Sequence, residues 1–171
     1  MKRLALILTL LIPLSAQAQI TPEQDTTVRL RQLEDRAALK SLVDTFSNLA
    51  DAKDVQGQLL LFTEDATVDS YVGGRLTSSL KGREQIGQTF SAFLAQFDTV
   101  YHQNGQQTVE LSGDRAKGTA YSLVVLIGMA NGKQVRTTSG VTYEDEYVRR
   151  DGRWLIAKRT SRFVWRTQEG A

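Results

Sequence analysis

The sequence predicts an α+β fold, with helices packed on one face of a strongly curved antiparallel sheet. The first observation is a helical pattern over residues 24–50, where apolar side chains recur every three or four positions. The second is a β pattern after residue 98, broken by tight-turn signals at Ser112–Gly113–Asp114, Asn131–Gly132 and Asp151–Gly152. Strands joined by such turns form an antiparallel meander. A curved sheet closed by a long helix encloses a cavity.

The other expected elements lie between these two regions. Residues 54–62 fit a short helix that ends in a run of apolar residues. Residues 65–71 and 76–81 alternate as strands and are joined by a glycine turn. A third helix begins at Gly82, with its apolar residues on one face. The strands of the meander are expected at residues 100–111, 115–130, 134–149 and 153–165.

Residues 1–18 have the pattern of a secretory signal peptide. A charged start precedes an apolar run over residues 4–14, and Ala16–Gln17–Ala18 is a small-x-small cleavage site. The run is too short to span a bilayer. We therefore expect a soluble exported protein, periplasmic or secreted, that begins at Gln19 and forms one domain over residues 19–171. No membrane contact is expected after cleavage.

Charge and composition disfavour several classes of partner. Without Lys2 and Arg3 the 21 basic residues fall to the number of acidic residues, 19, so the mature chain would have no net charge. The C-terminal arginines lack the interleaved aromatic pattern of nucleic-acid platforms, so no nucleic-acid partner is expected. A sequence without cysteine has no disulfide and no lipid attached at the cleavage site. One histidine without cysteine falls short of a usual zinc ligand set, so no metal is expected.

His102 is the single histidine of the sequence. Histidine is the side chain that titrates near neutral pH without help from its surroundings. In a chain without cysteine, proton transfer near pH 7 is therefore most readily carried out by His102. The alternative is a structural residue, hydrogen-bonded within a strand or exposed at its surface.

Asp51 follows the long helical pattern directly. Ideal helix geometry places it about 120° away from Leu39 and off the apolar stripe, so it faces the interior only if the helix ends near Ala50. An acid at this end is also unfavourable against the negative end of the helix dipole. Asp51 is therefore either a solvated acid at the helix end or a residue kept there for a function.

Arg159 lies among apolar neighbours on the last strand. The period-two rule puts Arg159 and Trp165 on the same face. A buried guanidinium is costly unless paired, so Arg159 should meet a carboxylate of the protein or an anion on a ligand. A structural ion pair and a position at the rim both remain open. On the second meander strand, Tyr121, Leu123 and Val125 share a face that would line the cavity, with core packing as the default explanation.

Several segments together form a recognisable pattern. They are Ala50–Asp51, LFTEDA at 61–66, KGREQI at 81–86, His102 with Asn104, and DEYVRRDGRWLI at 145–156 with Arg159. This series resembles the SnoaL-like family of the nuclear transport factor two-like superfamily, over almost all of the mature chain. The resemblance implies helices on the concave face of the sheet and a cone-shaped pocket.

The resemblance also implies roles for three residues. In lyases of the superfamily, such as hexachlorocyclohexane dehydrochlorinase and bile acid dehydratase, an aspartate after the first helix orients a histidine, and a last-strand arginine assists the leaving anion. These roles carry over to Asp51, His102 and Arg159 as catalytic residues. Both enzymes have a lysine or tyrosine one helical turn before the aspartate, where this sequence has Phe46. The second histidine of scytalone dehydratase, a further relative, is absent.

The functional prediction is an exported small-molecule pocket protein. The favoured interpretation is a lyase or isomerase without cofactor, similar to a dehydratase, dehydrohalogenase, ketosteroid isomerase or cyclase. It would act on a small apolar substrate through an Asp51–His102 dyad. Tyr71 and Tyr121 are the candidate proton donors. The alternatives are a non-catalytic small-ligand-binding protein and an interaction module, and self-association as a dimer or trimer through the sheet is expected. The predicted pocket residues are Phe46, Tyr71, Tyr121, Leu123, Val125 and Trp165.

Overall fold

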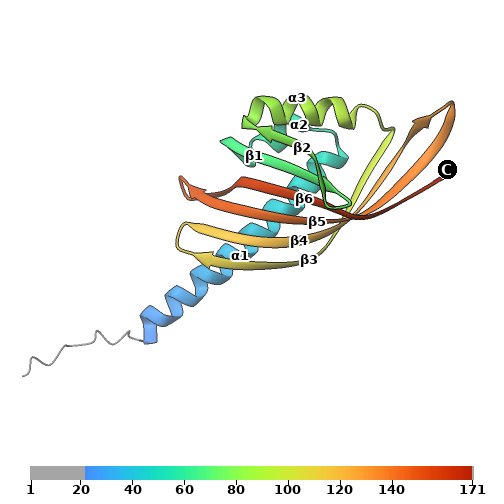
Figure 1. Ribbon diagram of the computed structural model, residues 1–171. Helices are drawn as coiled ribbons and strands as arrows, with labels where there is room; N and C mark the ends of the chain where they lie inside the picture. Colours follow the sequence, from blue (N-terminus) through green and yellow to red (C-terminus); the bar gives the residue numbers. More distant parts are fainter. Residues whose placement is uncertain (1–21, 171) are drawn as a thin grey trace, which may run out of the picture.

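The computed structural model describes residues 22–170, and its helices and strands follow the predicted order (Figure 1). The helices are α1 (Pro22–Asp51), α2 (Val55–Leu59) and α3 (Gly82–Leu94). The strands are β1 (Phe62–Val72), β2 (Arg75–Lys81), β3 (Thr99–Ser112), β4 (Arg115–Ala130), β5 (Lys133–Arg150) and β6 (Arg153–Gly170). The predicted signal peptide and the predicted start at Gln19 lie outside the described residues. Across residues 22–170, no helix combines the length and the apolar character needed to cross a membrane.

The strands form one open, mixed sheet in the order β2-β1-β6-β5-β4-β3. Strands β3 to β6 pair as the antiparallel meander that the turn signals predicted. The β1–β2 hairpin joins this meander because β1 pairs in parallel with β6. That pairing was not predicted, since it links strands from opposite ends of the domain that no turn connects. The α+β architecture is therefore confirmed, with a mixed rather than a purely antiparallel sheet.

Helix α1 packs across one face of the sheet, which we call the inner face. Leu39, Val43, Phe46 and Ala50 form the predicted apolar stripe and are buried. The helix begins well before the sheet that it covers, and its first part extends into solvent (Figure 1). Because only the second half of α1 carries the stripe, that half positions the residues of the site.

The end of α1 reverses the chain abruptly. Lys53 adopts a positive φ of 56°, and the backbone nitrogen of Asp54 donates to the carbonyl of Leu49 at 2.8 Å. A right-handed helix commonly ends in this way, with one residue in the left-handed conformation just after its last turn. Asp54 then caps α2 by accepting a hydrogen bond from the backbone nitrogen of Gly57 at 2.8 Å. Asp51 is the last residue of α1, two residues before Lys53.

The short second helix ends earlier than predicted. The sequence pattern extended it to Phe62, but Phe62 is the first residue of β1 and is fully buried. The backbone nitrogen of Ile156 donates to the carbonyl of Leu61 at 2.9 Å, so this segment is already bound to the sheet. Pairing with β6 therefore outweighs the helical spacing of the leucines.

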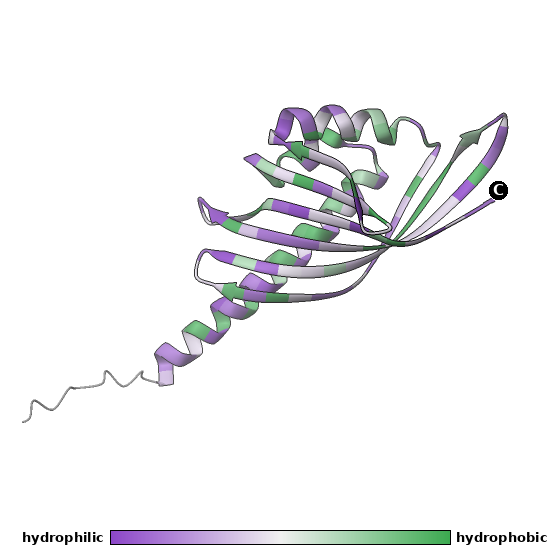
Figure 2. Cartoon of the chain, viewed as in Figure 1, coloured by the Kyte–Doolittle hydropathy of each residue, from purple (hydrophilic) through white to green (hydrophobic). Residues whose placement is uncertain are grey.

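The core lies between the inner face and the helices. Hydrophobic and hydrophilic residues alternate along much of the strands (Figure 2), as in a sheet with one buried face. Inner-face members of the core include Val68, Val100, Val124, Val141 and Ile156. The opposite face, which we call the outer face, is not covered by any described helix.

Candidate active site

A cavity of about 300 Å³ lies between the inner face of the sheet and the three helices. Its walls are mainly apolar and aromatic. They include Phe46, Val68, Leu80, Phe90, Val124 and Leu126. The volume is at the lower end of the range for ligand pockets, so it suits a small molecule. The polar and ionisable side chains on this wall include His102, Tyr143, Arg159 and Arg166.

Asp51 and His102 meet at the edge of this cavity. Asp51 Oδ1 lies 2.7 Å from His102 Nδ1, and Asp51 Oδ2 accepts a hydrogen bond from the His102 backbone nitrogen at 3.1 Å. The imidazole side chain is 8% exposed and the Asp51 side chain 26%. The expected hydrogen bond between them is therefore present. Asp51 makes this contact as the last residue of α1.

The surroundings keep His102 in its neutral form. Burial lowers the pKa of His102 below its ordinary value, since the imidazolium loses hydration, and the nearby Arg159 charge acts in the same direction. The hydrogen bond and charge of Asp51 oppose this shift without cancelling it. Because a carboxylate accepts, Nδ1 of the neutral ring carries the proton. Nε2 then holds a lone pair on a ring that lines the cavity.

Arg159 lies at the cavity wall and is paired within the protein. Its Nε and Nη2 donate to the two oxygens of Asp145 at 2.9 and 2.7 Å, and both side chains are essentially inaccessible to solvent. Its guanidinium carbon stacks 4.1 Å from the ring centre of Phe46 and 4.5 Å from that of Tyr143. Burial alone would lower the pKa of Arg159. The charge and hydrogen bonds of Asp145 raise this pKa by more than burial lowers it, so the net shift is upward.

One donor of Arg159 is not used by this pair. The buried Nη1 has no hydrogen-bond partner within residues 22–170. A buried guanidinium nitrogen without a partner is costly. Of the two alternatives for Arg159, the protein carboxylate is thus observed, and the buried Nη1 amino group is left unpaired.

Asp145 was not singled out from the sequence, although it opens the motif at 145–156. It also accepts a hydrogen bond from the Tyr147 hydroxyl at 2.9 Å, and Gln107 Nε2 lies 3.4 Å from that hydroxyl. Burial, with a smaller effect from the Asp145 charge, raises the pKa of Tyr147. Asp145 therefore has hydrogen bonds on both oxygens, as a buried carboxylate requires.

Tyr143 lines the cavity and was not predicted from the sequence. It is buried, and its ring meets that of Phe46 edge-on with centres 6.4 Å apart. Burial raises the pKa of Tyr143 to about 12, so its hydroxyl stays protonated at neutral pH. The period-two rule applied to β5 would have placed Tyr143 beside Asp145.

Four predicted pocket residues point away from the cavity. Tyr71 lies on the outer face, where the Arg162 guanidinium stacks 4.8 Å from its ring centre. Tyr121 and Leu123 line a separate hollow on the outer face, and Val125 lies on the same side of β4. The expectation that these four residues line the cavity is wrong. For the three residues of β4, both faces of the strand are apolar, and alternation alone does not say which face is buried.

Trp165 is also on the outer face, for a different reason. Phe163 pairs with Val141 and Trp165 pairs with Gly140, so Val164 is an extra residue that forms a β-bulge. The bulge reverses the alternation of side chains after Phe163. Arg166, and not Trp165, therefore lines the cavity. Of the six predicted pocket residues, Phe46 is the one found in the cavity wall.

The chain belongs to the SnoaL-like domain family, whose model matches residues 31–160. Three uncharacterised mycobacterial proteins, from Mycobacterium bovis and two strains of Mycobacterium tuberculosis, are 26% identical over 129 residues. The match covers 75% of this chain and 84% of theirs. The family model's range contains Asp51, His102 and Arg159.

Solved structures show the same fold. A scytalone dehydratase-like protein from Novosphingobium aromaticivorans DSM 12444 is 20% identical with a TM-score of 0.71, covering 82% of this chain and 91% of its own. The hexachlorocyclohexane dehydrochlorinase LinA-type3 from Novosphingobium barchaimii LL02 is 22% identical with a TM-score of 0.69, covering 82% and 94%. An NTF2-like protein with a cystatin-like fold from Novosphingobium aromaticivorans is 27% identical with a TM-score of 0.63, covering 84% of this chain and 90% of its own, so the predicted nuclear transport factor two-like architecture is confirmed.

Proposed function

We propose that this protein is a cofactor-independent lyase or isomerase in which His102 removes a proton from a carbon atom of a small substrate. The observation that carries the proposal is the double contact from Asp51 to His102, at Nδ1 and at the backbone nitrogen. These bonds fix both the position and the tautomer of the ring, which leaves Nε2 as the base. The lowered pKa of His102 supports the same role, since a base must be unprotonated to act.

The remaining polar groups fit the charge that such a step creates. In a β-elimination, Nε2 takes the proton, the C–H electron pair becomes the new C=C bond, and the leaving group departs with its own bonding pair. The free Nη1 of Arg159 and the protonated hydroxyl of Tyr143 are donors for the developing negative charge. An isomerisation begins with the same step and returns the proton to another carbon.

The second candidate is a binding protein that uses the cavity without turnover. Phe46 favours it, because this ring stacks on Arg159 at the position where the lyase relatives named above have a lysine or tyrosine. Unlike a lysine or a tyrosine, Phe46 cannot donate a proton to a leaving group. The two candidates share the ligand site and differ in whether His102 moves a proton.

An exchange experiment tests the proposal even while the substrate is unidentified. The purified protein is incubated with a metabolite extract in D₂O, and the extract is analysed by mass spectrometry. We expect at least one compound to gain deuterium or be converted with the wild type and not with His102→Ala. Compounds that bind equally to both proteins, with neither exchange nor conversion, would favour the binding protein.

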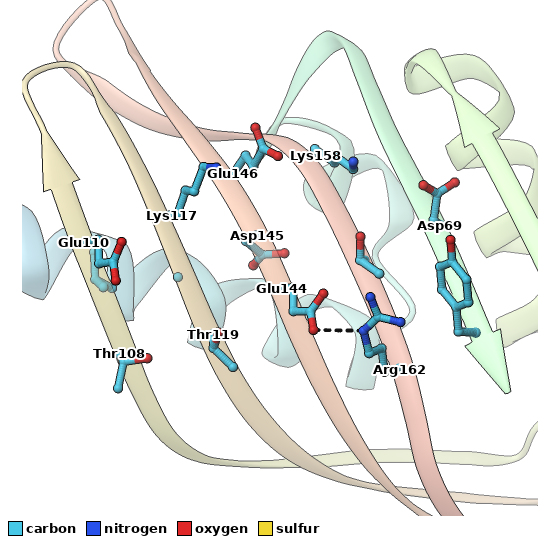
Figure 3. Close-up of a pocket in the computed structure, with 14 residues that line it drawn as sticks. Asp69, Thr108, Glu110, Lys117, Thr119, Glu144, Asp145, Glu146, Lys158 and Arg162 are labelled. Carbon is cyan, nitrogen blue, oxygen red and sulfur yellow. Dashed lines mark hydrogen bonds and ion pairs between the residues drawn. The ribbon is translucent and has the colours of Figure 1, made fainter. Parts of the chain in front are cut away.

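We also propose that the outer face joins two copies of the chain. Glu110, Lys117, Glu146 and Lys158 lie opposite one another on four successive strands and form a row of alternating charge (Figure 3). A two-fold axis that lies in the interface and crosses the centre of this row at a right angle reverses the order of the row on the facing copy. It would place Glu110 of one copy on Lys158 of the other, and Lys117 on Glu146. The row is therefore complementary to itself, as an isologous interface requires.

Sedimentation measures this association. We expect a dimer for the wild type and at least a tenfold weaker dimer for Lys117→Glu, which would place three acids in succession. Lys133→Glu, at the exposed β4–β5 turn, is the matched control and should remain a dimer. A monomeric or trimeric wild type, or a Lys117→Glu dimer of unchanged stability, would contradict the two-fold arrangement.

Export is proposed on the sequence pattern of residues 1–18. The absence of a membrane-crossing helix within residues 22–170 is compatible with it. Expression of the full chain and an intact-mass measurement on the exported fraction test the proposal. We expect the mass of residues 19–171, and a protein that retains Met1–Ala18 would contradict it.

A further inference from the structure

The β-bulge at Val164 brings one more cation to the cavity. Without the extra residue, Trp165 would continue on the inner face and Arg166 would point outward. With it, Arg166 lines the cavity wall, and its guanidinium stacks 5.3 Å from the ring centre of Phe163. A bulge beside a cavity is a common way to re-aim a side chain toward a site.

Arg166 and His102 belong to the same cross-strand row. His102 pairs with Val124, Val124 with Ser139, and Ser139 with Arg166. Three strand spacings separate His102 from Arg166 at the two ends of this row, so their backbones are about 14 Å apart. Both side chains line the same cavity, and the distance between their backbones leaves room for a small ring.

The charged side chains that line the cavity wall are basic. The ionisable side chains on its wall that carry or can acquire charge near neutral pH are His102, Arg159 and Arg166, and no aspartate or glutamate lines it among the described residues. Asp145 neutralises Arg159 through its bidentate contact. Arg166 has no carboxylate within ion-pair distance in residues 22–170, and its one hydrogen bond there is from Nε to Ser139 Oγ at 3.4 Å.

We propose that Arg166 binds the carboxylate of the substrate, which is therefore a small organic acid with an apolar body. The guanidinium matches the two oxygens of a carboxylate, while apolar side chains such as Val72 and Phe93 line the same cavity. With its acid group at Arg166, the other end of the molecule reaches His102. This inference rests on the proposed function for the use of the cavity, but it concerns recognition and not proton transfer.

Binding of matched acids and amides tests the inference. A panel of aromatic and alicyclic carboxylic acids, including trans-cinnamate, is measured by titration calorimetry alongside the corresponding primary amides. We expect the acids that bind best to bind the wild type about tenfold more tightly than their amides. Arg166→Gln should remove this preference, and Arg166→Lys should keep part of it, because lysine retains the charge but not the planar fork.

Two controls separate the possible failures. Arg153→Gln removes an exposed arginine at the other end of β6 and should leave the preference unchanged. His102→Ala should also keep it, so a protein without turnover that still prefers acids would refute the proposed enzyme and not this inference. Equal binding of acids and amides to the wild type, an unchanged preference in Arg166→Gln, or no binding by any acid in the panel would overturn it.

Discussion

The Asp51 carboxylate holds His102 at two points, accepting hydrogen bonds from ring Nδ1 at 2.7 Å and from the backbone nitrogen at 3.1 Å. The first contact sets the tautomer, and the second ties the end of α1 to the start of β3. An aspartate at this point therefore has both a local structural effect and a chemical one. The two can be separated because an asparagine retains most of the shape.

Asp51→Asn should reduce turnover far more than substrate binding. The amide can still meet the backbone nitrogen through its oxygen, but it no longer holds the proton on Nδ1 through a charged acceptor. We expect a loss in kcat of roughly 100-fold or more, and of 100-fold to 10,000-fold for His102→Ala, as for a lost general base. Rates with the substrate recovered from the extract measure this. A kcat within threefold of wild type in both variants would remove the dyad from the mechanism.

The stability of the protein should fall as the pH drops below about 6.5. The folded-state pKa of His102 is below its ordinary value of 6.5, so the unfolded chain takes up a proton first. The stability that neutral His102 contributes is complete above pH 6.5 and is lost as the pH falls toward its folded pKa. Below that pKa the loss levels off, because both states are then protonated.

Urea unfolding of the wild type and His102→Gln between pH 8 and pH 4.5 checks this dependence. Other groups titrate alike in both proteins, so the difference in unfolding free energy isolates His102. We expect the advantage of the wild type to shrink as the pH falls. A growing advantage would mean that the imidazolium–Asp51 attraction outweighs burial, and that the pKa of His102 is raised.

The buried pair of Arg159 and Asp145 should dominate the stability of the site. Asp145→Asn leaves the guanidinium charge buried without its counterion, and we expect a loss of about 3–5 kcal/mol in unfolding free energy. Glu144→Gln, one residue earlier, breaks the exposed ion pair with Arg162 and should cost less than about 1 kcal/mol. Thermal and urea unfolding give both values. Similar losses for the two variants would show that burial of the pair has little influence.

The main features of the fold and the residues of the dyad could be predicted from the sequence, because helical periodicity, turn residues and one histidine are local signals. The contact of Asp51 with His102 could not be predicted from helical periodicity, since it depends on how α1 packs against β3. The faces of β4 could not be distinguished, because Tyr121 and Val124 stand on opposite sides of a strand that is apolar on both. The parallel pairing of β1 with β6 is a long-range contact, and alternation within either strand carries no information about it.

The bulge at Val164 moves Trp165 out of the predicted site and Arg166 into it, and it gives the last prediction. Because Trp165 is on the outer face, Trp165→Ala should leave ligand affinity within about twofold of the wild type. Phe163→Ala, two residues earlier and on the cavity wall, should weaken binding about tenfold or more, since a buried aromatic contact is lost. Titration of the acid that binds best compares the two variants directly. Weaker binding by Trp165→Ala than by Phe163→Ala would mean that the strand continues without the bulge, and that Arg166 does not face the cavity.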